Sequence, residues 1–219
     1  MNSTILELVV LAGIAVFLIL RLRSVLGTRD GFEKPPATAP VARPDRARDF
    51  DVIDGGPDHD IVDHVPEGSP AAKALAEMKR VEPSFNVSEF LSGARGAYEM
   101  ILMGFDNGNI RDLKPFIAED VYETFEQVIA HREEQGLTIE AEFIGVRDMK
   151  LADATFDPQT RRAEVTVSYV GELTSVVKNA EGEIVEGDPR AIKKQKDVWT
   201  YARIMGSDDP NWQLSATDE

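Results

Sequence analysis

The sequence predicts an α+β domain that follows a single membrane-spanning helix and a long tether. Three observations lead to this prediction. Residues 5–20 form an almost uninterrupted apolar run, residues 27–83 are rich in proline, and apolar residues further on repeat first with a helical period and then with a strand period. The chain therefore divides into an anchor (residues 1–26), a tether (27–83) and one domain of ordinary size (84–219).

The apolar run Ile5–Leu20 is predicted to cross a membrane. Sixteen helical residues rise about 24 Å, and Arg21 and Arg23 can extend to the headgroups to complete a hydrocarbon core of about 30 Å. A cleaved signal peptide is the alternative, but its positive charges precede the apolar run, whereas here they follow it. Because arginine favours the cytoplasmic side, we expect a single-pass protein with its N-terminus outside and its domain in the cytoplasm.

The segment 27–83 is predicted to be a disordered, acidic tether. Eight of the 12 prolines lie in it and large apolar residues are sparse, so it cannot bury enough surface to offset the entropy of ordering. A short helix is predicted near residues 70–80, because Ser69 can cap it and Pro70 suits its first turn.

Composition excludes several kinds of site and partner. Without cysteine there is no disulfide framework, thiolate zinc site or thiol nucleophile. A net charge of −15 disfavours nucleic acid as a partner. In the tether, His59, Asp60, Asp63 and His64 could bind a divalent cation, but a linker with two incidental histidines is the simpler interpretation. We predict no metal site and no cofactor.

The first half of the domain has the pattern of three helices. Asn86 and Glu89 form a capping-box pattern, and apolar residues then recur every three or four positions until Asn107-Gly108 ends the helix. A short second helix, broken around Pro115, and a third helix that ends at Gly136 are predicted to follow.

After Gly136 the apolar period changes from 3.6 to 2, which indicates strands. The alternation slips at Gly145, where a glycine suits a β-bulge. Further strands are predicted from residue 165, over 190–205 and around residues 212–214, with residues 181–189 as an acidic loop. Helices followed by long, bending strands predict an α+β layout in which the sheet curves around a helix as a cone with an apolar cavity.

Residues 84–126 resemble the beginning of the Tim44-like domain family, which includes the chaperone-tethering subunit of the mitochondrial inner-membrane translocase. The resemblance is carried by Phe90-Leu91, Gly93-Ala94-Arg95, Ala97-Tyr98, Leu113, Phe116, Val121-Tyr122 and Phe125, and later by Asp208–Leu214 with its Trp212. It covers about residues 70–219 and is closest to a bacterial, membrane-anchored branch. It implies a nuclear-transport-factor-two-like cone and an adaptor that tethers a DnaK-class chaperone or membrane-protein translocation and assembly machinery.

We therefore predict a membrane-anchored adaptor for protein partners at the cytoplasmic face of the bacterial inner membrane. One alternative is a module whose apolar cavity binds a lipid or hydrophobic peptide. Another is an isomerase or dehydratase, which needs a carboxylate or imidazole with a shifted pKa in the cavity. The domain's one histidine, His131, follows a polar helix end, and no strand offers a convincing catalytic carboxylate. We predict no catalytic residue and no enzymatic activity.

Two sets of residues are candidates for binding. Aromatic residues around the cone could line a cavity for a ligand or partner, although a packed core is the alternative. They are Phe90, Tyr98, Phe105, Phe125, Phe143, Trp199, Tyr201 and Trp212. A basic cluster could contact anionic headgroups, although lysines that protect an edge strand from pairing are a sufficient explanation. It consists of Arg190, Lys193, Lys194 and Lys196.

Overall fold

A computed structural model describes residues 58–218. These residues belong to one compact unit. The predicted anchor and the first part of the predicted tether lie outside the described residues. Between residues 58 and 218, no helix is long and apolar enough to cross a membrane.

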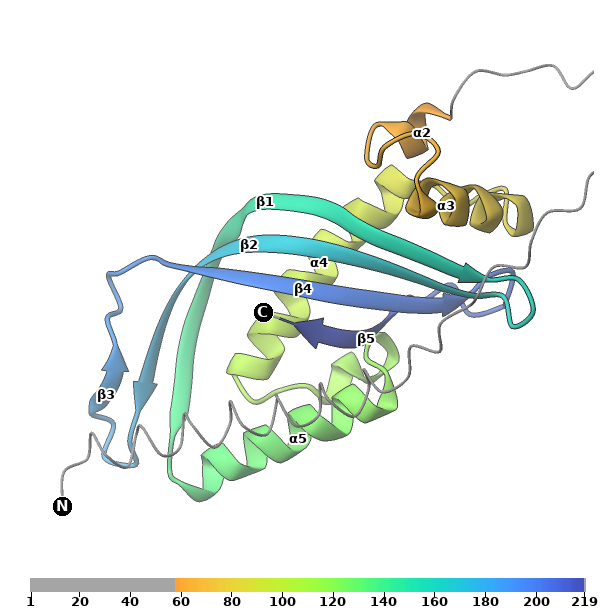
Figure 1. Ribbon diagram of the computed structural model, residues 1–219. Helices are drawn as coiled ribbons and strands as arrows, with labels where there is room; N and C mark the ends of the chain where they lie inside the picture. Colours follow the sequence, from red (N-terminus) through yellow and green to blue (C-terminus); the bar gives the residue numbers. More distant parts are fainter. Residues whose placement is uncertain (1–57, 219) are drawn as a thin grey trace, which may run out of the picture. The chain divides into compact units, whose positions relative to one another are not determined.

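Helices precede strands, so the predicted α+β class is confirmed (Figure 1). The helices are α2 (His59–Val62), α3 (Pro70–Val81), α4 (Val87–Asp106), the 3₁₀ helix η1 (Arg111–Phe116) and α5 (Glu119–Glu134). The strands are β1 (Thr138–Asp157), β2 (Arg162–Lys178), β3 (Ile184–Gly187), β4 (Lys193–Ile204) and β5 (Gln213–Asp218).

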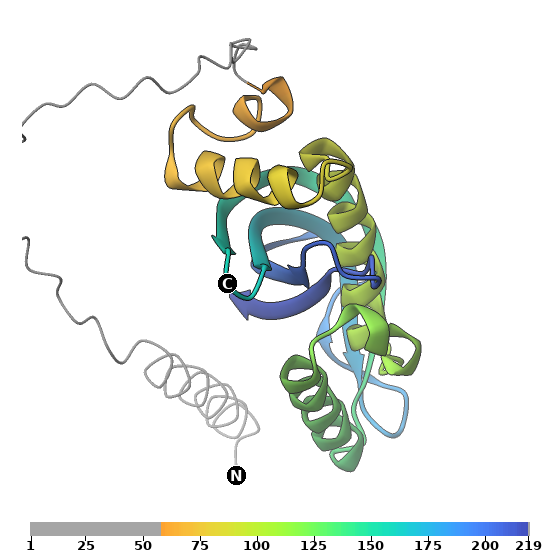
Figure 2. The ribbon, with the colours of Figure 1, turned by 90° about the vertical axis from the view of Figure 1, so that its right-hand side faces the viewer.

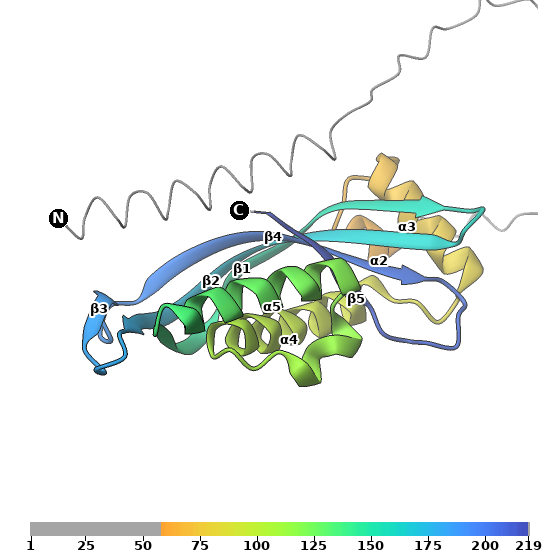
Figure 3. The same cartoon turned by 90° about the horizontal axis from the view of Figure 1, so that it is seen from below.

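The strands form one antiparallel sheet in the order β1-β2-β4-β5, with β3 paired to β2. Figure 1 shows that the long strands bend strongly. The register of β1 against β2 shifts three times, and the first shift lies between Phe143 and Gly145, as predicted from the glycine. The bulges let the sheet curve, and Figure 3 shows α4 and α5 on the same side of it.

The prediction of a loop over residues 181–189 is partly wrong, because β3 lies within it. Residues of β3 pair with Val176–Lys178, at the C-terminal end of β2. Gly187 has φ +86°, and a Cβ there would lie 2.3 Å from the Ser175 carbonyl oxygen. Only glycine allows the two backbones to approach this closely. Strand β3 therefore depends on a backbone contact with β2, which the pattern of apolar residues in 184–187 does not indicate.

Helix α4 begins and ends where its local signals predict. The Asn86 side chain accepts a hydrogen bond from the Glu89 N–H (2.8 Å), and Gly108 follows the helix with φ +71°. Its apolar side faces the sheet and includes the fully buried Val87, Tyr98 and Ile101. This helix therefore supplies the centre of the core.

The last part of the predicted tether is folded. The predicted short helix is present as α3, capped by Ser69 and buried through Leu75 and Met78, both 0% exposed. It packs beside the end of β1 (Figure 2). Before it, Ile61 and Val65 also enter the core. The folded part therefore extends back to residue 58, well before the residue 84 expected from apolar density.

Asp60, one of the four tether residues weighed as cation ligands, holds the start of α4. Its carboxylate accepts hydrogen bonds from the N–H groups of Val87 (2.7 Å) and Ser88 (3.0 Å), and Lys79 lies 2.7 Å away. Burial alone would raise the pKa of Asp60, but these partners lower it to about 2. Within residues 58–218, no group of three or more acidic or histidine side chains is placed to hold a metal ion.

Candidate functional site

A continuous group of aromatic rings fills the space between α4 and the sheet. Tyr98 of α4 stacks on Tyr169 of β2, with ring centroids 4.3 Å apart, and contacts Trp199 at 4.8 Å and Phe143 at 6.0 Å. Trp199 in turn contacts Tyr201 at 6.4 Å. These rings come from a helix and three strands, and the sheet curvature brings them together.

The group continues toward the beginning of α4. Phe90 contacts Tyr201 at 5.9 Å and Trp212 at 4.8 Å, and Phe85 contacts Trp212 at 5.8 Å. Phe85 was not among the predicted cavity residues. Six of the eight predicted aromatic residues therefore form one group. Its middle members are buried, whereas Phe143 and Trp212 at its two ends are partly buried.

The other two predicted residues, Phe105 and Phe125, form a separate pair with centroids 4.6 Å apart. Arg132 of α5 lies 5.4 Å above the Phe105 ring and donates a 2.8 Å hydrogen bond to the Phe105 carbonyl. A cation on the last carbonyls of a helix is favourable, so this contact fastens α5 to the end of α4. Ligand binding by any of the eight residues stays a prediction.

Sequence reasoning missed a buried carboxylate beside these rings. Asp197 of β4 is 7% exposed, accepts a 2.5 Å hydrogen bond from the Tyr98 hydroxyl, and accepts another from the Gln195 amide (3.1 Å). Burial, followed by the nearby Asp197 carboxylate, raises the pKa of Tyr98 far above its ordinary value. The alternation of side chains along a strand could have indicated this burial. Asp197 precedes the inward-facing Trp199 by two residues, so the two side chains point to the same face of β4.

Two further tyrosines share one acceptor in the core. The hydroxyls of Tyr169 and Tyr201 lie 3.0 Å apart, and both lie within 3.4 Å of the Ala94 carbonyl oxygen of α4. Burial is the main cause that raises the pKa of each phenol. These hydroxyls are neutral and partnered within the core, so they position the helix against the sheet.

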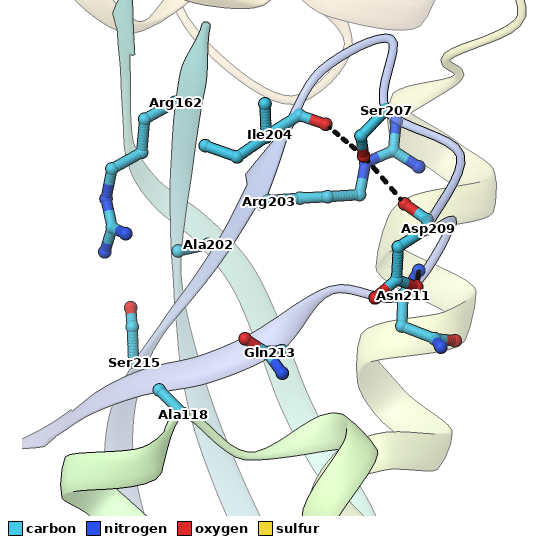
Figure 4. Close-up of a pocket in the computed structure, with 10 residues that line it drawn as sticks. All are labelled: Ala118, Arg162, Ala202, Arg203, Ile204, Ser207, Asp209, Asn211, Gln213 and Ser215. Carbon is cyan, nitrogen blue, oxygen red and sulfur yellow. Dashed lines mark hydrogen bonds between the residues drawn. The ribbon is translucent and has the colours of Figure 1, made fainter. Parts of the chain in front are cut away.

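Two surface hollows lie outside the group of buried rings and hydroxyls. One, of about 300 Å³, is bordered by β4, β5 and their connection (Figure 4). Its lining includes Arg162, Ser207 and Gln213. Arg203 also borders it, but this guanidinium pairs with Glu82 at 2.5 Å and lies 5.3 Å from the Trp212 ring. It is therefore occupied in joining α3 to the sheet.

The second hollow, of about 480 Å³, lies between η1 and α5 and includes Ile110, Tyr122 and Glu126. Neither hollow is lined by Tyr98 or Asp197. His131 is exposed near the end of α5, as expected from its polar surroundings.

The predicted basic cluster lies at the beginning of β4. Lys194 and Lys196 share one face of the strand and Lys193 points to the other, as expected from strand alternation, while Arg190 lies in the preceding turn. All four side chains are exposed. Their contact with anionic headgroups stays a prediction.

Comparison with known proteins assigns this arrangement to a family. The Tim44-like domain matches residues 71–219. Mitochondrial import inner membrane translocase subunit TIM44 from Homo sapiens is 25% identical over 146 residues, and its Rattus norvegicus counterpart is 26% identical. Each alignment covers 65% of this chain but 32% of the relative, so the chain matches about a third of the length of these relatives.

Among solved structures, the crystal structure of the intermembrane space region of the chloroplast protein ARC6 can be superposed on this chain. The superposition covers 66% of this chain and 94% of the ARC6 chain. At 13% identity and a TM-score of 0.36, this overlap is too low to define a shared fold. The sequence match extends over most of the folded part, from α3 to the last strand. The chain belongs to the Tim44-like domain family.

Proposed function

We propose that the chain is a membrane-anchored adaptor that binds protein partners at the cytoplasmic face of the bacterial inner membrane. The observation that carries the proposal is the family match over residues 71–219, together with relatives that are subunits of a protein-import translocase. We further propose a nuclear-transport-factor-two-like cone, in accord with the curved sheet around α4. The partners proposed are a DnaK-class chaperone or components of membrane-protein translocation and assembly.

The proposed anchor and tether give the adaptor a physical basis. Residues 5–20 would hold the protein at the membrane, and a flexible segment between anchor and domain would keep the domain near any membrane-bound partner. Confinement of this kind raises the effective concentration of the domain, so weak contacts suffice for capture. No catalytic group is needed for this role.

In-cell crosslinking and affinity purification of the full-length protein are expected to recover a chaperone or membrane-protein machinery from the membrane fraction. As a control, Leu11→Arg with Ala15→Arg places two charges in the apolar run and changes no residue of the described part, 58–218. This variant should leave the membrane fraction and lose most of the captured partners. A reporter that is active only outside the cytoplasm should stay silent when fused after Glu219.

Recovery of a single metabolic enzyme, or of no protein, would argue against an adaptor. An active reporter would overturn the proposed orientation but not the adaptor role. Membrane binding that persists in the double-arginine variant would show that another segment attaches the protein to the membrane.

A second candidate function is to hold an apolar ligand. The observation in its favour is that Phe143 and Trp212, at the two ends of the aromatic group, are only partly buried. Protein purified from membranes should then carry lipid detectable by native mass spectrometry, and Phe143→Ala should reduce it while Ile144→Ala, at an exposed neighbour, should not. Absence of copurified lipid would count against this candidate.

A further inference from the structure

Half of strand β4 has an open edge. On one side, β4 pairs with β2 along its whole length, from Lys193 to Ile204. On the other side, β5 pairs only with Val198–Ala202. Among the described strands, none pairs with that side of Lys193–Asp197, and Figure 1 shows β5 beside only the later part of β4. An open edge presents unpaired N–H and C=O groups that can accept another strand.

The side chains along this edge are mostly basic, whereas the chain as a whole is acidic. Arg190, Lys194 and Lys196 make no ion pair within residues 58–218. The chain as a whole has a net charge of −15. A local basic edge on an acidic protein repels strands of like charge and attracts acidic ones.

Exposed aliphatic residues lie at the same end of the sheet. Ile184 and Val185 of β3 are 48% and 49% exposed, and Ile192, which directly precedes β4, is 59% exposed. Strand β3 lies on the same side of β2 as β4 does, a few residues further along β2, and Ile192 directly precedes the open edge. A segment with both carboxylates and aliphatic side chains would complement this surface.

We propose that the open edge, Lys193–Asp197, binds an extended acidic segment of a partner protein, which adds to the sheet as a strand. The proposal rests on the adaptor function and names the chemistry of the partner. Main-chain hydrogen bonds supply binding, and carboxylates opposite Lys194 and Lys196 supply selectivity. The added strand continues the row that β5 begins, because Asp218 of β5 pairs with Val198.

The first test uses a fluorescent, end-capped peptide of alternating glutamate and valine with the full-length protein. It is expected to bind with an affinity that falls as salt rises. A control peptide has the same sequence but carries backbone N-methyl groups at alternate residues. It keeps its charge but loses backbone N–H hydrogen-bond donors, so it should bind at least about tenfold more weakly. A lysine–valine peptide should not bind.

The second test changes the protein. Lys194→Glu with Lys196→Glu should weaken binding of the acidic peptide about tenfold. Lys73→Glu with Arg95→Glu makes the same change in net charge at exposed helix positions and should leave binding unchanged. Hydrogen exchange of the wild-type amides from Lys193 to Asp197 should slow when the peptide is present, which localises binding without any substitution.

Equal binding of the N-methylated peptide would overturn strand addition, and so would protection of amides elsewhere in the domain. If the acidic peptide fails to bind while the full-length protein still captures partners in cells, the edge proposal is wrong and the adaptor function stands. If the peptide binds but no partner is captured in cells, the adaptor function fails instead.

Discussion

Replacing Tyr98 with alanine is expected to lower the free energy of unfolding by about 4 kcal/mol. The side chain is 0% exposed and its ring contacts Phe143, Tyr169 and Trp199. Removing the ring leaves a cavity between α4 and the sheet, and it also leaves the buried Asp197 carboxylate without its closest donor. Urea unfolding followed by tryptophan fluorescence measures the loss, because Trp199 belongs to the same group.

Two milder changes separate packing from hydrogen bonding. Tyr98→Phe keeps the ring and removes only the donor to Asp197, which should cost about 1–3 kcal/mol. Tyr122→Phe is the matched control, since its hydroxyl bonds the exposed Glu126, and it should cost less than about 0.5 kcal/mol. Equal losses for the two substitutions would show that the bond to Asp197 does not stabilise the fold.

Replacing Asp60 with alanine is expected to destabilise the protein by about 1–2 kcal/mol at neutral pH. The substitution removes the acceptor for two N–H groups at the start of α4 and the partner of Lys79. A negative charge at a helix N-terminus is also favourable, so its loss adds to the cost. Asp63→Ala, at an exposed position three residues later, is the control and should have little effect.

The effect of Asp60 should depend on pH in a defined direction. Its pKa is about 2 in the folded protein and about 4 in an unfolded chain. Because the folded value is lower, the stabilisation is fully present above pH 4 and is lost as pH falls toward 2. The stability difference between wild type and Asp60→Ala should narrow over that range, and a difference that grows on acidification would contradict this assignment.

The fold was predictable where its signals are local. Asn86 and Gly108 bound α4 through contacts within a few residues of the chain, and the bulge at Gly145 interrupts an alternation visible in the sequence itself. The α+β class follows from these short-range patterns, because helical and strand periods differ whatever the chain packs against.

The site was less predictable because its contacts join distant segments. Tyr98 and Asp197 are 99 residues apart in sequence, and Asp60 caps a helix that begins 27 residues later. Asp197 follows several lysines, and this sequence context is typical of a surface residue. Its burial depends on the register of β4 against β2, in which Asp197 lies opposite the buried Tyr169. The sequence was enough to name the aromatic residues as a set. It did not indicate that six of them form one group and that Phe105 and Phe125 form a separate pair.

The sequence by itself determined the class of the domain, the limits of its main helix and its family, since each depends on local periodicity, caps or motif residues. Only the tertiary structure decided that folding extends back to residue 58, that Asp197 is buried and that one side of Lys193–Asp197 pairs with none of the described strands. The physical reason is that burial and strand pairing are set by which distant segments meet, and the bending of the sheet around α4 decides this.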